Sequence, residues 1–370
     1  MMVVLLTGAA CGGGGLDTDP LASIAAAVNE DMRSPPRLAE AWRRMPERPL
    51  TYRPAVGTRN VYLALGNQLA AWDVATGEPR WAPIELDSDI SAAPVALGQQ
   101  VVIASRGRAD TPARIWWFAS DSTMLAQTPV SDAVNEISAV PGTVLYIDGR
   151  GVGRLGSGVE WHTAVDEPVS VDLSAHHGLA FVTTAAGKLL AFDVISGSLR
   201  WEHDAGGPIT RASVAGDRVY VGGGDLGLFA LRATDGHGIW NRRLGTAVLG
   251  APAYAENILW VGALDSKLHA FNAGNGTEIV SLLVDLSSRN YLDIASFEPW
   301  IVVGAHYGPW LAVRGPTRNE QRQTPIQVTV QQPNLPGRPD LSIAPGSGPA
   351  GVAVVNGDGT VVFLQPRRSR

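Results

Sequence analysis

Five tryptophans recur along this chain at nearly constant intervals. Trp42, Trp81, Trp161, Trp201 and Trp240 are separated by 39, 80, 40 and 39 residues. A fixed period of roughly 20–50 residues is the sequence signature of a stacked or circular repeat fold. Each unit of such a fold buries its faces against its neighbours, so the period outweighs the usual expectation that 370 residues form two or three domains.

Short apolar segments of strand length repeat with the same period. Eight of them lie at 61–65, 101–105, 144–148, 179–183, 219–223, 259–263, 301–305 and 352–356. Gly, Asp and Asn fill the gaps between these segments, which is typical of turns between antiparallel strands. The best-formed unit, residues 208–240, reads as four strands, which are named A, B, C and D in chain order.

The turn between strands C and D has its own chemistry. Residues 73–77 read Asp-Val-Ala-Thr-Gly before Trp81, and residues 193–197 read Asp-Val-Ile-Ser-Gly before Trp201. The turn is degraded to Asn-Ala-Gly-Asn-Gly at 272–276. Asp or Asn accepts hydrogen bonds from backbone N–H groups of its own turn, and Gly permits a positive φ. We therefore expect the Trp, four residues after the Gly, to point from strand D into the gap between sheets.

These units predict an all-β fold, an eight-bladed β-propeller of four-stranded antiparallel blades. The last unit supplies strand A at 341–343, strand B at 352–356 and strand C at 360–364, but no strand D. Residues 38–42 read as a strand D with no A, B or C before it, and Trp42 is in register. We predict that this N-terminal strand completes the last blade and closes the ring.

The single cysteine, Cys11, stands between an apolar segment at 2–10 and four glycines. This arrangement resembles the lipobox of a bacterial lipoprotein, in which the cysteine is lipidated and becomes the first residue of the mature chain. The apolar segment is too short to span a bilayer. We therefore expect a signal peptide at 1–10, a lipidated flexible tether at 11–37 and a single propeller domain at 38–370. The alternative is an unmodified cysteine in a disordered N-terminal segment.

The Asp-x-x-Ser/Thr-Gly-x-x-x-Trp turn and the forty-residue period resemble the pyrroloquinoline-quinone-type propeller repeat. With the predicted N-terminal strand and the lipobox, residues 38–366 are similar to the BamB family of outer-membrane assembly lipoproteins. The resemblance implies a non-catalytic scaffold, a monomer within a complex, that binds the barrel-forming subunit of the β-barrel assembly machinery. The residue after Cys11 is Gly12 rather than the Asp that retains such lipoproteins at the inner membrane in enterobacteria. The resemblance thus implies a lipid anchor on the periplasmic side of the outer membrane.

In that family, loops of mid-chain blades that carry apolar residues and an Arg contact the barrel-forming subunit. The nearest match here is Pro208-Ile209-Thr210-Arg211, so the resemblance makes Ile209 and Arg211 the candidate partner-binding residues. The family's fuller Leu-x-Leu-Arg pattern is not reproduced. The alternative is that Ile209 belongs to the core of a strand A and that Arg211 is its solvated neighbour.

Other functions find less support in the sequence. The net charge of -6 and the absence of a basic stripe argue against a nucleic-acid partner. Quinoprotein dehydrogenases resemble this fold, but they have a longer chain, calcium ligands and usually an adjacent cysteine pair, which a single cysteine excludes. We therefore expect no cofactor and no metal. A lipid-anchored scaffold for a different envelope complex stays open as an alternative.

Three local motifs invite a chemical interpretation. Residues 151–156 match G-x-G-x-x-G, but a dinucleotide site needs a helix to follow, and a turn and strand D follow instead. His176 and His177 lack a third ligand at a suggestive spacing, which favours an exposed loop between strands A and B. Residues 356–359 read Asn-Gly-Asp-Gly, which fits a tight hairpin turn better than a calcium loop.

Overall fold

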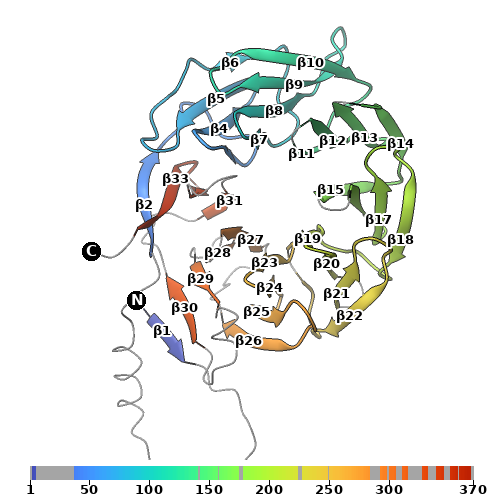
Figure 1. The fold of residues 1–370 in the computed structure, drawn as a ribbon. Helices are drawn as coiled ribbons and strands as arrows, with labels where there is room; N and C mark the ends of the chain where they lie inside the picture. Colours follow the sequence, from blue (N-terminus) through green and yellow to red (C-terminus); the bar gives the residue numbers. More distant parts are fainter. Residues whose placement is uncertain are drawn as a thin grey trace, which may run out of the picture.

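The strands of this protein form a closed ring of sheets. The computed structural model describes residues 2–5, 37–140, 142–156, 158–174, 178–223, 227–248, 250–283, 292–297, 300–305, 311–315, 327–331, 339–345, 351–356 and 358–367. Every named element within these residues is a β-strand, and the sheets follow one another around a centre (Figure 1). Within the same residues, no helix has the length and apolar character needed to cross a membrane. The predicted all-β propeller is therefore confirmed.

Six consecutive sheets are each built from four strands that follow one another in the chain. Sheet 1 contains β3 (Ala55–Val56), β4 (Asn60–Leu65), β5 (Gln68–Asp73) and β6 (Ile84–Glu85). Sheet 2 contains β7 (Val95–Leu97), β8 (Gln100–Ser105), β9 (Ala113–Ala119) and β10 (Met124–Val130). Sheet 3 contains β11 (Glu136–Val140), β12 (Thr143–Ile147), β13 (Gly151–Gly156) and β14 (Trp161–Ala164). Sheet 4 contains β15 (Pro168–Ser174), β16 (Leu179–Thr184), β17 (Lys188–Asp193) and β18 (Leu199–Asp204). Sheet 5 contains β19 (Ser213–Ala215), β20 (Arg218–Gly223), β21 (Gly227–Arg232) and β22 (Gly238–Arg243). Sheet 6 contains β23 (Ala253–Ala255), β24 (Ile258–Gly262), β25 (Lys267–Asn272) and β26 (Glu278–Leu283).

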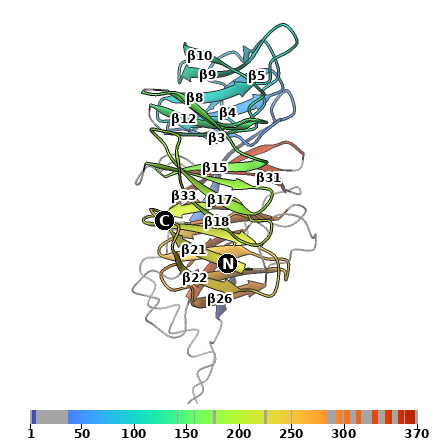
Figure 2. The ribbon, with the colours of Figure 1, turned by 90° about the vertical axis from the view of Figure 1, so that its right-hand side faces the viewer.

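The remaining two sheets each include a strand from the N-terminal part of the chain. Sheet 7 contains β27 (Leu292–Phe297), β28 (Trp300–Ala305), β29 (Leu311–Arg314), β30 (Gln327–Gln331) and β1 (Met2–Leu5). Sheet 8 contains β31 (Pro339–Pro345), β32 (Val352–Asn356), β33 (Val361–Arg367) and β2 (Arg37–Arg44). Strand A of each sheet lies nearest the centre of the ring and strand D lies toward its outer rim, with β1 outside strand D in sheet 7 (Figure 1). Figure 2 shows the ring from its side.

The prediction of four strands in every blade is wrong for sheet 7. Among the described residues, seven sheets have four strands, whereas sheet 7 has the five-strand order β1-β30-β29-β28-β27. Strand β1 pairs antiparallel with β30, with Val3 opposite Thr329. An outer strand presents a row of unpaired backbone N–H and C=O groups, and a further strand can pair with them. Strand β1 lies inside the predicted signal segment 1–10.

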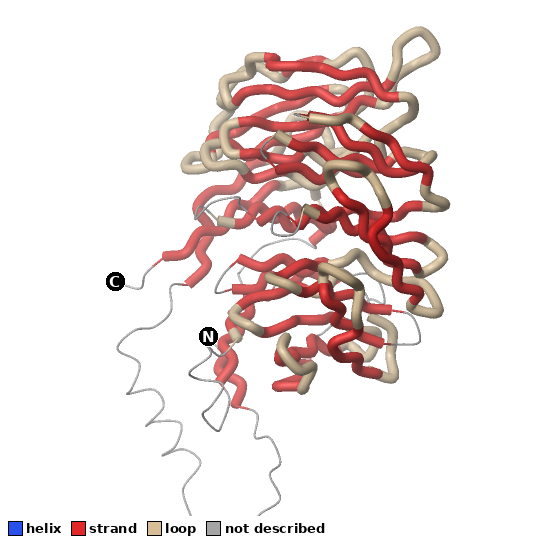
Figure 3. The backbone as a smooth tube through the Cα atoms, turned by 45° about the vertical axis from the view of Figure 1, so that its right-hand side comes forward, coloured by secondary structure: helices blue, strands red, loops and turns tan. Residues whose placement is uncertain are grey.

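The ring closes through its N-terminal strand. Strand β2 pairs antiparallel with β33, with Trp42 opposite Phe363. The Trp42 ring stacks on Phe363 at a centroid distance of 5.4 Å and meets the Trp72 ring of sheet 1 edge-on at 6.0 Å. The predicted closure is confirmed, with β2 beginning at Arg37, one residue before the predicted boundary. The tube view shows the two partner strands running side by side (Figure 3).

Apolar contacts between consecutive sheets form the core. Eight buried clusters of described residues each combine side chains from two neighbouring sheets, all the way around the ring. The inner B strands are therefore buried on both faces, and β4 is buried along its whole length. This explains why the sequence shows continuous apolar segments there rather than the alternation of a strand with one wet face.

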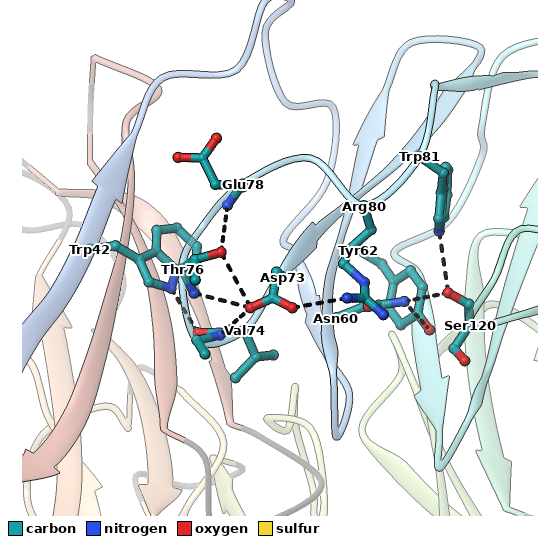
Figure 4. A network of polar contacts seen from close by, with 11 residues as sticks. Trp42, Asn60, Tyr62, Asp73, Val74, Thr76, Glu78, Arg80, Trp81 and Ser120 are labelled. Atoms are coloured by element: carbon teal, nitrogen blue, oxygen red, sulfur yellow. Dashed lines mark hydrogen bonds and ion pairs between the residues drawn. The ribbon is translucent and has the colours of Figure 1, made fainter.

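Four of the five recurring Trp side chains reach from strand D to the next sheet, whereas Trp81 lies before β6 and donates its indole N–H to the carbonyl of Ser120 in sheet 2 at 3.3 Å. The indole N–H of Trp42 donates to the carbonyl of Val74 at 2.7 Å, and a β-carbon on Gly77 would lie 2.6 Å from the Trp42 ring (Figure 4). We call this contact a tryptophan lock. It recurs between three further pairs of sheets, through Trp161 with Val194 and Gly197, Trp201 with Ala233 and Gly236, and Trp240 with Ala273 and Gly276. The expected position of the Trp side chains between sheets is confirmed, but the prediction that they all stand on strand D is wrong for Trp81.

The turn carboxylates act as predicted. The Asp73 carboxylate accepts the backbone N–H groups of Ala75 and Thr76 at 2.9 and 3.1 Å. Asp193 makes the same contacts with its own turn, and Arg200 adds a side-chain bond at 2.9 Å. The backbone N–H of Ser196, followed by Arg200, lowers the pKa of Asp193 to about 2. Because this pKa lies below its unfolded value, the contribution to stability is present above about pH 4 and is lost as the pH falls through about 2.

Candidate interaction surface

The two ends of the ring carry different connections. In an antiparallel A–B–C–D meander, the A–B and C–D turns lie at one end, and the B–C turns and D–A loops lie at the other. The tryptophan locks use the C–D turns, so that end of the ring helps to hold the sheets together. The opposite end, which we call the D–A face, carries the loops 45–54 and 205–212. It is the end at which loops can vary without breaking a lock.

Ile209 and Arg211 lie on the D–A face, in the loop between β18 and β19. The backbone N–H of Thr210 donates to the carbonyl of Gly222 at 2.7 Å, and Ile209 forms a bridge to Gly223. The half-buried Ile209 side chain packs against the cluster between sheets 4 and 5. This position matches the alternative interpretation of Ile209 as part of the core beside strand A.

Arg211 is held by a carboxylate from another sheet. Its guanidinium forms an ion pair with Glu136, which begins β11, the innermost strand of sheet 3. The two side chains are 32% and 17% exposed, so the pair is half-buried. Arg211 therefore connects the inner loop before sheet 5 to sheet 3, and it is more than a solvated neighbour of Ile209. No local pattern marks Glu136, because the contact joins residues far apart in the chain.

A cleft opens on the same face where the ring closes. It has a volume of about 490 Å³ and is lined by the loop Met45–Arg53 and by Val355, Asn356, Asp358 and Gly359 of sheet 8. Met45 is 59% exposed, and Glu47, Arg48 and Asp358 are also exposed. Met45 is thus the most exposed of the large apolar side chains in the lining, and charges of both signs surround it. No sequence pattern marks this cleft, because the loop after β2 meets the B–C turn of sheet 8 only once the ring is closed.

Two histidines each contact carboxylates of their own sheet. His162 lies 3.0 Å from Asp148 through Nε2, and Asp148 also accepts the backbone N–H groups of its own turn. His269 has Glu278 at 2.8 Å from Nδ1 and Asp265 at 3.1 Å from Nε2. These ring nitrogens are engaged with carboxylates on the same sheet. The described part of the chain contains no group of three or more His, Cys, Asp or Glu residues able to hold a metal ion.

The remaining motifs fall into ordinary β structure or outside the described residues. Residues 151–156 form β13, and a turn and strand β14 follow it in place of the helix that a dinucleotide site requires. The turn at 356–360 closes with the N–H of Gly359 donating to the carbonyl of Asn356 at 2.8 Å. Cys11, His176 and His177 lie outside the residues that the structure describes.

Comparison with known proteins agrees with this architecture. The crystal structure of BamB from Moraxella catarrhalis has a TM-score of 0.66 at 14% identity and covers 89% of this chain and 100% of its own. The computationally designed Ika8 protein scores 0.65 at 14% identity, covering 89% and 99%, and Saccharomyces cerevisiae Sqt1 scores 0.65 at 9% identity, covering 91% and 100%. At such identities these likenesses show the propeller fold alone. Among curated protein sequences, none is significantly similar to the chain.

The sequence itself carries the family relationship. The family described as outer membrane protein assembly factor BamB matches residues 34–126 and 206–366, which together make up more than half of the chain. The first matched part contains the closing strand β2 and sheet 1, and the second contains sheets 5 and 6, strands β27 to β32 and all but the last residue of β33. The chain belongs to the BamB family of outer-membrane protein assembly factors.

Proposed function

We propose that this protein is a non-catalytic periplasmic scaffold that binds the barrel-forming subunit of the outer-membrane β-barrel assembly machinery. The observation that carries the proposal is the family match over residues 34–126 and 206–366. The fold supports it, because the locks and the double-sided burial of the B strands make the ring a rigid support for its loops. In this proposal all eight sheets serve as blades, and β1 is an addition to the seventh.

The D–A face is the surface proposed to contact the partner. It is separate from the C–D turns that hold the locks, and it contains Ile209, Arg211 and the cleft beside Met45. Charged and apolar groups stand close together on it, which suits a polar protein interface that is assembled within a larger complex. Ile209 and Arg211 are proposed as partner-binding residues on this face.

A pull-down from detergent-solubilised membranes tests the scaffold proposal. Tagged protein is expected to recover the barrel-forming subunit, identified by mass spectrometry. Recovery of a different envelope complex without that subunit would replace the proposal with the alternative scaffold. Titration with pyrroloquinoline quinone and Ca²⁺ is expected to leave the absorbance spectrum of the quinone unchanged, and a saturable change would instead indicate a quinoprotein.

Replacing Arg211 by Glu is expected to weaken binding to the purified periplasmic domains of the barrel-forming subunit about tenfold or more. A hydrogen bond to a charged group is worth about 1.5–3 kcal/mol, and the variant places a carboxylate where a guanidinium stood. The measurement is a titration by biolayer interferometry, with a thermal melt to show that the ring is intact.

The structure supplies a matched control for this variant, because Arg211 also pairs with Glu136. The double variant Arg211→Glu, Glu136→Arg restores an ion pair inside the ring with reversed polarity. Binding is expected to stay weak in the double variant if Arg211 contacts the partner directly. Recovery of binding would show that Arg211 acts only by holding the loop, and unchanged affinity in the single variant would remove Arg211 from the interface.

We also propose that residues 1–10 are a signal segment, that residues 11–37 are a tether and that Cys11 carries the lipid anchor. Acyl chains contribute about 0.8 kcal/mol per buried methylene, so more than one chain gives a durable attachment. Cys11→Ser is expected to release the protein into the soluble periplasmic fraction, measured by fractionation and immunoblotting. Gly12→Ser, which leaves the cysteine in place, is the control and should stay with the membrane. Membrane retention of Cys11→Ser would contradict the anchor.

A further inference from the structure

The outer strands of most sheets carry features that discourage pairing with another chain. Charged side chains, prolines and bulges on an edge strand are the usual protection against strand addition. Charged residues lie on β2, β6, β18, β22 and β26, and β10 has Pro129 and a register shift between Met124 and Ala126. Strand β14 is only four residues long.

Strand β30 is different. Its sequence is Gln-Val-Thr-Val-Gln, which contains no charge, no Pro and no Gly, and Val and Thr favour extended structure. It extends beyond the inner strand of its own sheet, because β29 pairs only with residues 329–331 of the described chain. Gln327 and Val328 thus pair with β1 alone among the described residues. The edge is a preformed template for an added strand.

The structure shows such a strand in place. Residues 2–5, Met-Val-Val-Leu, pair antiparallel along β30, with Met2 opposite Val330 and Leu5 opposite Gln327, and β1 lies beside β30 at the outer rim (Figure 1). The occupant is short, uncharged and rich in aliphatic residues. Main-chain hydrogen bonds supply the affinity in this mode of recognition, and alternate side chains supply the selectivity.

We propose that the outer edge of β30 is a strand-addition site for an extended, uncharged, aliphatic segment of a partner protein, and that residues 2–5 occupy this site in the unprocessed chain. The inference rests on the proposed function, in which residues 1–10 are removed from the mature protein. In this proposal, removal of residues 1–10 exposes the outer edge of β30 in the mature protein in the periplasm. The site lies on the outer rim of sheet 7, away from the loop that carries Arg211.

Peptide binding to two forms of the full chain tests the proposal. The probe is a synthetic peptide of residues 1–8 with two lysines and fluorescein at its C-terminus, followed by fluorescence anisotropy. The unmodified chain is compared with the variant Val3→Pro, Val4→Pro, which removes the N–H groups of the two central residues of β1 and so weakens its pairing with β30. The variant is expected to bind the peptide at least tenfold more tightly, because a tethered strand competes at an effective concentration of about millimolar.

Proline substitutions in the edge locate the binding. Val328→Pro and Gln327→Pro are each added to the Val3→Pro, Val4→Pro chain, and one of these two substitutions is expected to abolish peptide binding. Both are tested because neighbouring residues of a strand direct their N–H groups to opposite sides, so one of the two blocks the outer edge. Ser281→Pro in β26, the outer strand of sheet 6, is the matched control and should leave binding unchanged. A peptide that itself carries Val3→Pro and Val4→Pro should not bind.

Equal peptide affinity for the two chains, or affinity unaffected by both edge prolines, would overturn the strand-addition site. Thermal melts verify that each proline variant keeps the ring. A failure here accompanied by recovery of the barrel-forming subunit in the pull-down would leave the scaffold proposal standing. Peptide binding at β30 without recovery of that subunit would contradict the scaffold proposal and support the strand-addition site.

Discussion

Deleting residues 37–44 is expected to abolish the cooperative unfolding of the ring. Sheet 8 would lose its outer strand, and with it the stacking of Trp42 on Phe363 at 5.4 Å and the Trp42 lock onto sheet 1. The apolar cluster between sheets 8 and 1 would be exposed at the break. Because sheets of a repeat protein are stabilised mainly by their neighbours, an opened ring frays from its free sheets. Calorimetry should show a broad transition at a lower temperature.

The variant Trp42→Ala separates the side chain from the strand. It keeps the backbone pairing of β2 with β33, so unfolding should stay cooperative, while the free energy of unfolding falls by about 3–5 kcal/mol, the usual cost of truncating a buried Trp. A truncated protein that melts as sharply and at as high a temperature as the intact chain would show that β2 does not close the ring.

Gly236→Ala is expected to destabilise the ring far more than a glycine substitution of the same kind usually does. Gly236 has a φ of 70° and lies under the Trp201 ring, where a β-carbon would be 2.7 Å from the nearest ring carbon. The variant must strain the turn and also lift the indole away from the carbonyl of Ala233. We expect a loss of about 3 kcal/mol or more, combining left-handed strain with the displacement of the half-buried Trp201 ring.

Gly216→Ala provides the matched control within the same sheet. Gly216 has a φ of 60°, and a β-carbon there would meet no atom within 4 Å. Gly216→Ala is therefore expected to lower the free energy of unfolding by the backbone strain alone, about 1–2 kcal/mol. The difference between the two variants in urea denaturation therefore measures the lock. Equal losses for Gly216→Ala and Gly236→Ala would mean that the stacked Trp contributes nothing to the contact between sheets.

The architecture could be predicted from the sequence because its determinants are local and repeated. The turn at 73–77 carries the carboxylate, the glycine and the spacing to the next Trp within one short segment. The closing strand was visible because Trp42 keeps the period although no A, B or C strand precedes it. The period therefore locates strands A to D of the regular units.

The rest depends on contacts between distant segments. Three features each join segments that are far apart in the chain and that the repeat does not relate to one another. They are the ion pair of Arg211 with Glu136, the cleft beside Met45 and the pairing of β1 with β30. The missing lock between sheets 2 and 3 is an intermediate case. The 80-residue interval between Trp81 and Trp161 already shows that a Trp is absent, and the pairing register shows that Ala126 takes its position, opposite Trp117, where Trp201 stands opposite Ala191 in sheet 4.

Site-specific photo-crosslinking in cells tests most directly the claim that the D–A face contacts the assembly machinery. The two labelled positions are Arg150 in the B–C turn of sheet 3, 68% exposed, and Ile195 in the C–D turn of sheet 4, 70% exposed. They are equally accessible and lie at opposite ends of the ring. The account predicts crosslinks to the barrel-forming subunit from position 150 and none from position 195. Crosslinks to that subunit from position 195 alone would contradict it.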